Sequence, residues 1–149
     1  MLAMRRIWLL TAITAMLGLP VTATADVLPS PYRIVAPANG ECLAFTGELV
    51  GTRSCGDSAT ALYIAPGAFD DNIHIRHLTR CLTTGELTPS AFTCGEDGQD
   101  WLLEEIADDE YRITDAKDGR ALTFVDNKTI GFAVATTDPL SGWRIEPVR

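Results

Sequence analysis

The sequence has 149 residues, of which 12 are Lys or Arg and 20 are Asp or Glu, so its formal net charge is −8. An acidic chain repels nucleic acid and the surface of anionic membranes, so neither is an expected partner. The length suits a single compact domain behind a short leader.

The first 25 residues have the pattern of a secretory signal peptide. Arg5 and Arg6 precede an apolar run over residues 7–19, and Ala23 and Ala25 form a small-x-small cleavage site. The run is shorter than the roughly 20 residues that a membrane span needs. We therefore expect cleavage before Asp26, export to the periplasm or out of the cell, and no insertion into a membrane.

Beyond residue 25 the sequence alternates short β-rich runs with turns. The runs are rich in β-branched and aromatic residues, as in "YRIV" (32–35), "IHIR" (73–76), "ALTFV" (121–125) and "GFAVAT" (131–136). Gly, Pro, Asn and Asp between them favour turns. Only "DWLLEEIADDEY" (100–111) comes near a helical period, and it allows no more than a helical turn. An all-β fold is expected.

The four cysteines, Cys42, Cys55, Cys81 and Cys94, all follow the leader. An oxidising compartment favours disulfides, and four cysteines permit three pairings. Structural zinc usually needs closer pairs, such as C-x2-C, which the sequence does not contain. The spacing within each pair is the same, because Cys42 to Cys81 and Cys55 to Cys94 are both separated by 39 positions.

This equal offset indicates an internal repeat of about 40 residues. "YRIVAPANGECL" (32–43), "NIHIRHLTRCL" (72–82) and "YRITDAKDGRAL" (111–122) align as three copies. The alignment brings Ile34, Ile73 and Ile113 to one position, which we expect in a shared core. Four strands in each unit, at about 30–70, 71–109 and 110–149, predict a β-trefoil with pseudo-threefold symmetry over residues 26–149. A propeller would need more blades.

The second unit combines Cys81-Leu82, Cys94 thirteen positions later, and Gln99-Asp100-Trp101. In this combination it resembles a repeat of the ricin B-type β-trefoil lectins. The first unit keeps Gly40, Cys42-Leu43 and Cys55 but has Leu62 in place of the tryptophan; the third keeps Gly119 and Trp143 but has Ala121 and Val134 in place of the cysteines. The resemblance implies disulfides within each unit, Cys42 to Cys55 and Cys81 to Cys94. It also implies that Trp101 and Trp143 are core residues.

Sugar sites of such lectins use an Asp after the Cys-Leu pair, an aromatic ring near the second cysteine and an Asn before the Gln-x-Trp. Here Thr83 and Gly98 replace the Asp and the Asn of the second unit. The ring position holds Phe92, with Phe132 and Arg53 as its expected counterparts in the other units, and both phenylalanines also fit an apolar role in a hairpin. Since the acceptor that binds most strongly is missing, binding should be weak. The candidate ligand-binding residues are Phe92, Asp97, Gln99 and Thr83.

An enzyme is not expected. Gly56-Asp57-Ser58 and the spacing of Asp71 and His74 resemble hydrolase motifs, but the sequence contains no G-x-S-x-G nucleophile elbow. On one strand, His74 and His77 would point to opposite faces, so no metal and no cofactor are expected. The resemblance implies an exported, non-catalytic module that binds carbohydrate or glycoconjugate. The alternative is a trefoil that binds protein, as a toxin-like or envelope accessory subunit or as a protease inhibitor. The oligomeric state stays open.

Overall fold

The computed structural model describes residues 30–67, 69, 71–126, 129–133 and 139–148, and the predicted signal peptide and Val134 lie outside this range. The described residues form one antiparallel sheet of twelve strands and two 3-10 helices. The predicted all-β fold is thereby confirmed. The strands are β1 (Tyr32–Val35), β2 (Cys42–Thr46), β3 (Leu49–Arg53), β4 (Tyr63–Pro66), β5 (Ile73–His77), β6 (Arg80–Thr83), β7 (Ser90–Thr93), β8 (Trp101–Ala107), β9 (Glu110–Asp115), β10 (Ala121–Asp126), β11 (Thr129–Ala133) and β12 (Trp143–Pro147), and the helices are η1 (Ser58–Thr60) and η2 (Pro139–Ser141).

Six of the strands close into a barrel. Around the ring β1 pairs with β12, β12 with β9, β9 with β8, β8 with β5 and β5 with β4. A bridge between Tyr32 and Leu62 then joins the segment before β4 back to β1. Where β1 meets β12, the backbone N–H of Val148 also donates to the carbonyl of Pro31 at 3.0 Å. Closure leaves the barrel without a free strand edge.

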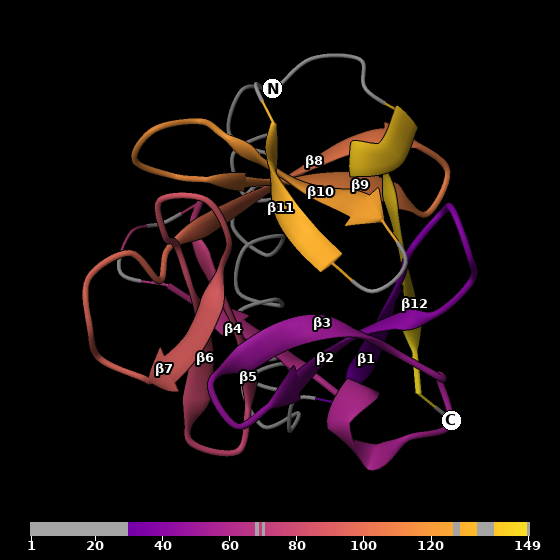
Figure 1. Ribbon diagram of the computed structural model, residues 1–149. Helices are drawn as coiled ribbons and strands as arrows, with labels where there is room; N and C mark the ends of the chain where they lie inside the picture. Colours follow the sequence, from indigo (N-terminus) through magenta and orange to yellow (C-terminus); the bar gives the residue numbers. More distant parts are fainter. Residues whose placement is uncertain (1–29, 68, 70, 127–128, 134–138, 149) are drawn as a thin grey trace, which may run out of the picture.

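The other six strands form three hairpins, β2–β3, β6–β7 and β10–β11. Figure 1 shows the hairpins arranged around one centre, one in each lobe. β3 pairs with β7 through Leu49 and Ser90, and with β11 through Gly51 and Thr129. A six-stranded barrel with three surrounding hairpins is the architecture of a β-trefoil, so the predicted pseudo-threefold fold is confirmed.

The core consists of equivalent residues from the three lobes, and each of these side chains has an exposed fraction of 0%. The indole Nε1 of Trp101 donates to the carbonyl of Leu82 at 2.9 Å, and that of Trp143 donates to the carbonyl of Leu122 at 3.0 Å. Each ring therefore fills the core and satisfies its one polar group. By position, the three sets of equivalent residues are Ile34, Ile75 and Ile113; Leu43, Leu82 and Leu122; and Leu62, Trp101 and Trp143.

One expected member of the core is corrected. Ile73 is only partly buried, and Ile75 occupies the position equivalent to Ile34 and Ile113. The reason is the length of the turn that follows, because the paired residues Val35 and Cys42 are 7 positions apart whereas the paired residues Arg76 and Cys81 are 5 positions apart. Because of the shorter turn, the core residue of β5 lies two positions closer to Cys81 than Ile34 lies to Cys42. Ile73 still packs against the edge of the core.

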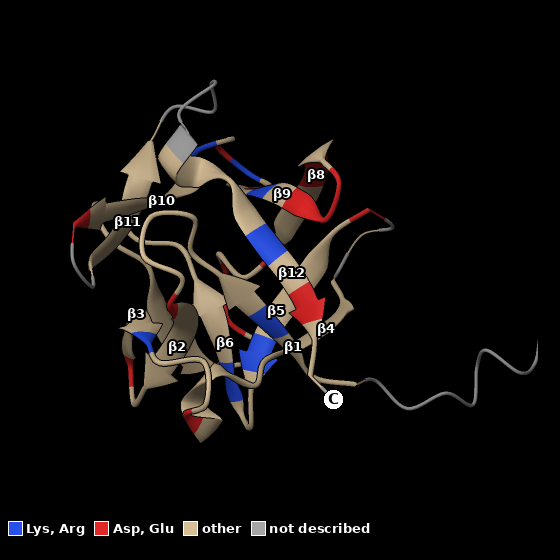
Figure 2. Ribbon diagram, turned by 90° about the vertical axis from the view of Figure 1, so that its right-hand side faces the viewer, with Lys and Arg blue, Asp and Glu red and all other residues tan. Residues whose placement is uncertain are grey.

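The Asp and Glu residues, which outnumber Lys and Arg, lie on several strands and turns of the fold (Figure 2). Figure 2 shows Asp and Glu at the turn between β8 and β9, and Lys or Arg on β1, β5 and β12. None of the described helices has the length and apolarity needed to cross a membrane.

Candidate functional site

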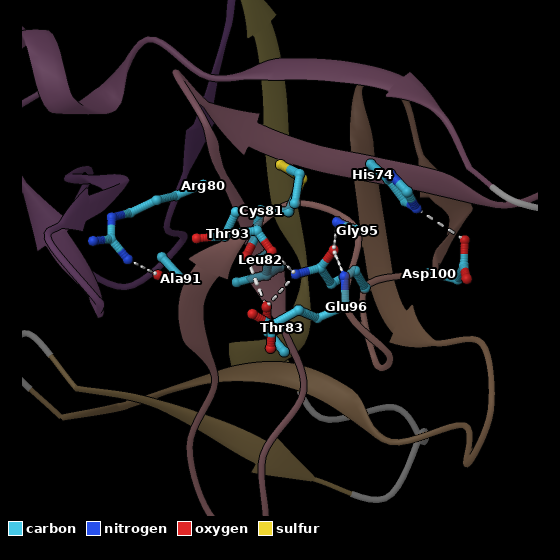
Figure 3. The surroundings of a disulfide bond; sticks show 12 residues. His74, Arg80, Cys81, Leu82, Thr83, Ala91, Thr93, Gly95, Glu96 and Asp100 are labelled. Carbon is cyan, nitrogen blue, oxygen red and sulfur yellow. Dashed lines mark hydrogen bonds and ion pairs between the residues drawn. A yellow bond between two sulfur atoms is a disulfide. The ribbon is translucent and has the colours of Figure 1, made fainter.

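Gln99 is buried and makes four hydrogen bonds in the second lobe, to partners that Figure 3 labels. Its Oε1 accepts from the backbone N–H of Gly95 at 2.9 Å and of Glu96 at 3.2 Å. Its Nε2 donates to the Thr83 hydroxyl and to the Thr93 carbonyl, both at 3.0 Å. The amide therefore uses both donors and both acceptor positions inside the protein.

The side chain of Thr83 is also buried and hydrogen-bonded within the protein. It is 4% exposed, and its hydroxyl donates to the carbonyl of Cys81 at 2.9 Å while accepting from Gln99. The structure thus assigns Thr83 and Gln99 a structural role, where the sequence had indicated ligand contacts. Thr83 occupies the position of the lectin Asp, and its hydroxyl lies inside the protein because it bonds to the Cys81 carbonyl and to Gln99.

Both implied disulfides are present in the structure. Cys42 is bonded to Cys55 and Cys81 to Cys94, each pair within one lobe. Cys42 and Cys81 belong to the first residues of the hairpin strands β2 and β6, so each bond links a hairpin to the loop behind it. The bonds are consistent with an oxidising compartment.

Phe92 and Asp97 are the two candidate residues that reach the surface. Phe92 is half-buried on β7, opposite Cys81, and Asp97 is exposed in the loop before β8. Phe132 is not the counterpart of Phe92, because Phe132 pairs with Leu122 and it is Ala133 that pairs with Ala121. A register shift between residues 124 and 126 lengthens the third hairpin and produces this difference.

The surface beside Thr83 is closed by the third lobe. The backbone N–H of Thr84 donates to the carbonyl of Gly98 at 2.7 Å. Arg120 extends from the β9–β10 turn and donates to the Thr84 hydroxyl at 3.1 Å and to the carbonyls of Gly85 at 2.8 Å and Glu86 at 2.9 Å. Position 98, where such lectins carry Asn, has φ +80, and an added Cβ would lie 2.7 Å from Thr84 Cγ2. No larger residue fits there without a shift.

An open cleft of about 740 Å³ is lined in part by the same loop. It lies between the loop at 95–100, the start of the second lobe and the β9–β10 turn. Its described lining residues are Phe69, Asn72, His74, Gly95, Glu96, Asp97, Gly98, Asp100, Asp115, Ala116 and Lys117.

Three contacts hold the walls of this cleft. His74 Nε2 lies 3.1 Å from Asp100 Oδ1, in a pair that Figure 3 shows beside the loop. The backbone N–H of Ala116 donates to the carbonyl of Asp100 at 3.0 Å, which joins the second lobe to the third. Asp115 is 3% exposed, and its carboxylate accepts from the backbone N–H of Lys117 at 2.8 Å. Among the described residues that line the cleft, Asp97 is the one that the sequence had indicated as a ligand contact.

The hydrolase-like motif at Gly56-Asp57-Ser58 has a structural explanation. Asp57 caps η1, and its Oδ1 accepts from the backbone N–H of Ala59 at 2.9 Å. That hydrogen bond, together with Arg53, holds the pKa of Asp57 below its usual value. Ser58 is the first residue of the helix.

The two histidines have separate partners. His77 Nδ1 lies 3.3 Å from the carbonyl of Ala61, away from the His74 pair. Within the described residues, no group of three or more His, Cys, Asp or Glu side chains could hold a metal ion.

No protein-family model and no curated protein matches the sequence. Solved structures do match. SeviL bound to asialo-GM1 saccharide is 12% identical, with a TM-score of 0.73, over 82% of this chain and 100% of that chain. A chain of the Haemophilus ducreyi cytolethal distending toxin is 16% identical, with a TM-score of 0.67, over 82% and 88%. ThreeFoil, a designed 3-fold symmetric protein, is 18% identical, with a TM-score of 0.64, over 78% and 98%. The fold that these structures share with this chain is a β-trefoil, as the resemblance to the ricin B-type lectins had implied.

Proposed function

We propose that this chain is an exported, non-catalytic binding module that takes carbohydrate on its second lobe. The observation that carries the proposal is the composition of that lobe: a disulfide and the Gln99 network hold one loop, Phe92 is half-buried on the strand before it, and Asp97 is exposed within it. A rigid loop with an aromatic ring and a carboxylate suits a polyhydroxylated ligand. SeviL, with the same fold, is bound to a saccharide.

In this proposal Phe92 stacks on the face of a pyranose and Asp97 accepts hydrogen bonds from its hydroxyls. Stacking contributes about 1 kcal/mol beyond the area that it buries. Thr83 offers no carboxylate in place of the lectin Asp, so the charge-assisted bond of that position is absent. We therefore expect dissociation constants for single sugars of roughly 1 mM.

Export is supported by two kinds of observation. The sequence begins with the pattern of a secretory leader, and the structure has two disulfides. Disulfides persist in the periplasm and outside the cell.

The test is a titration of the mature chain with simple galactosides and N-acetylated sugars, followed by amide chemical shifts. Shifts should cluster around Phe92 and Asp97. Phe92→Ala should abolish them, and Arg53→Ala, at the equivalent register of the first lobe, should preserve them. Shifts around Arg53 or Phe132 that spare Phe92 would contradict the choice of lobe. No shift at high millimolar sugar would contradict carbohydrate binding altogether.

A second candidate function is protein binding, as a toxin-like or envelope accessory subunit or as a protease inhibitor. It is favoured by apolar side chains exposed on the three hairpins, at Leu49 (74%), Leu87 (81%) and Val125 (52%). Apolar groups that gather at a surface often mark contacts between proteins. A glycan array discriminates between the two candidates, because specific retention of a glycan supports the first and a blank array favours the second.

A further inference from the structure

We propose that the cleft between the second and third lobes binds a sugar that carries a free amino group. The inference rests on the proposed function. It adds the class of sugar, and it adds a binding site other than the surface around Phe92 on the second hairpin. The cleft is open, and its volume of about 740 Å³ is within the range typical of small-ligand sites.

The surface beside Thr83 is occupied by contacts within the protein. There the Thr84 to Gly98 hydrogen bond draws the hairpin against the loop, and Arg120 occupies the hydroxyl and carbonyl acceptors of residues 84–86. A ligand at that point would have to displace a guanidinium that makes four hydrogen bonds or ion pairs. Arg120 is not among the described residues that line the cleft, so a ligand there needs no such displacement.

The lining of the cleft combines the groups that hold a sugar. Phe69, with 71% of its surface exposed, supplies an aromatic face. The amide of Asn72 and the carboxylates of Asp97 and Asp100 supply hydrogen-bonding groups for hydroxyls. An aromatic face also attracts a cation that lies over it.

The charges of the lining select among sugars. Four carboxylates, those of Glu96, Asp97, Asp100 and Asp115, line the cleft, whereas Lys117 is the described lining residue with a permanent positive charge. Asp115 is 3% exposed, so its attraction for a cation is screened less than that of a surface carboxylate. An ammonium group on the ligand is therefore favoured, and a carboxylate or sulfate is disfavoured.

The cleft is already assembled without a ligand. The contact of His74 with Asp100 joins β5 to the loop, and the hydrogen bond from Ala116 to Asp100 joins that loop to the third lobe. A preassembled site avoids the cost of ordering its walls when the ligand binds.

The test uses three sugars that differ at one substituent: glucosamine, glucose and glucuronate. The mature chain is titrated with each at low salt and followed by amide shifts. We expect glucosamine to bind about fivefold more tightly than glucose, as one partly screened ion pair allows, and glucuronate to bind most weakly. The shifts should fall on residues 95–100 and 115–117, and those of 115–117 distinguish the cleft because Asp97 belongs to both proposed sites. The preference for the amine should decrease in concentrated salt.

Asp97→Asn should reduce the preference for glucosamine over glucose severalfold while the fold, followed by the remaining amide shifts, stays intact. Asp108→Asn removes one negative charge from the β8–β9 turn, outside the lining of the cleft, and should leave the preference unchanged. Equal binding of glucosamine and glucose, or shifts confined to the surroundings of Phe92, would overturn the inference and leave the proposed function intact. If neither these sugars nor any glycan on an array binds, the proposed function itself fails.

Discussion

The guanidinium carbon of Arg120 lies 4.2 Å from the centroid of the Phe132 ring. Phe132 in turn stacks on Trp101, with the ring centroids 6.2 Å apart and the planes 7° from parallel. The same guanidinium donates to the carbonyls of Gly85 and Glu86 in the second lobe. A cation, a half-buried ring and a core indole therefore connect the third lobe to the second.

Arg120→Ala should lower the free energy of unfolding by about 2 kcal/mol, because it removes charge-assisted hydrogen bonds and a cation–π contact together. Arg120→Lys should recover only part of this loss, since an ammonium cannot replace the planar fork. Urea denaturation measures both. Arg144→Ala is the control, because the ion pair of Arg144 with Glu146 lies at the surface and its loss should cost less than about 0.5 kcal/mol. Equal effects at the two arginines would contradict the proposed link between lobes.

The protonation of Asp118 should depend on the same arginine. Desolvation raises the pKa of Asp118, but hydrogen bonds from the backbone N–H and the guanidinium of Arg120 lower it further, so that it lies below its usual value. A lowered pKa in the folded state adds stability above the ordinary pKa of Asp, and this stability is lost as the pH falls through the folded value. Arg120→Ala should raise the pKa, which an NMR titration of the carboxyl carbon would detect. An unchanged titration would show that the ion pair does not persist in solution.

Trp101→Ala should cost about 3 to 5 kcal/mol, as deletions of large buried aromatic rings do. The ring is fully buried and also supports Phe132. Trp143→Ala tests the equivalent position in the third lobe and should cost a similar amount without the effect on Phe132. A cost below about 1 kcal/mol at Trp101, measured by denaturant unfolding, would not be compatible with a core residue.

Removal of the disulfide in the second lobe, by replacing Cys81 and Cys94 with alanine, should cost about 3 kcal/mol. The cysteines are 13 positions apart, and closing a loop of this length constrains the unfolded chain by about that amount. The same double replacement at Cys42 and Cys55, which have the same separation, is a matched comparison. Peptide mapping without reduction should recover these two pairs, and any bond between lobes would contradict the assignment.

Leu78→Asn should stabilise the protein. Leu78 has φ 54 in the turn between β5 and β6 and is 75% exposed, so its side chain gains little from packing while its backbone is in the left-handed region. That region costs most L-residues about 1 kcal/mol or more, and asparagine tolerates it better. Thermal unfolding should show a higher midpoint. A lower midpoint would mean that Leu78 contributes by packing in a way that its exposure does not suggest.

The repeat and the fold could be predicted from the sequence because each lobe repeats its cysteine, leucine or tryptophan at nearly constant spacing. The exact register could not. Ile73 was expected in the core, but a turn two residues shorter places Ile75 there, and a sequence alignment that keeps gaps small does not detect this change. In the third lobe an irregular hairpin displaces Phe132 from the position of Phe92 in the same way.

The candidate site was harder to predict for a different reason. Thr83 and Gln99 carry groups that suit a ligand, and only burial reveals that these groups bond to each other. His74 and Asp100 are 26 positions apart, and Lys117 belongs to another lobe, so no local pattern connects them. The cleft forms where two lobes pack against each other, and the repeated pattern within one lobe does not predict how the lobes pack.

The pairing of β1 with β12 joins the first and last strands of the fold, from Tyr32 with Pro147 to Val35 with Arg144. Until the final strand has been synthesised, β1 lacks this neighbour and the barrel cannot close. Pairings so distant in sequence also slow folding, because the intervening chain must be ordered before they form. The lobes resemble one another, yet none has a complete barrel wall of its own. Stability should therefore be acquired in one late cooperative step.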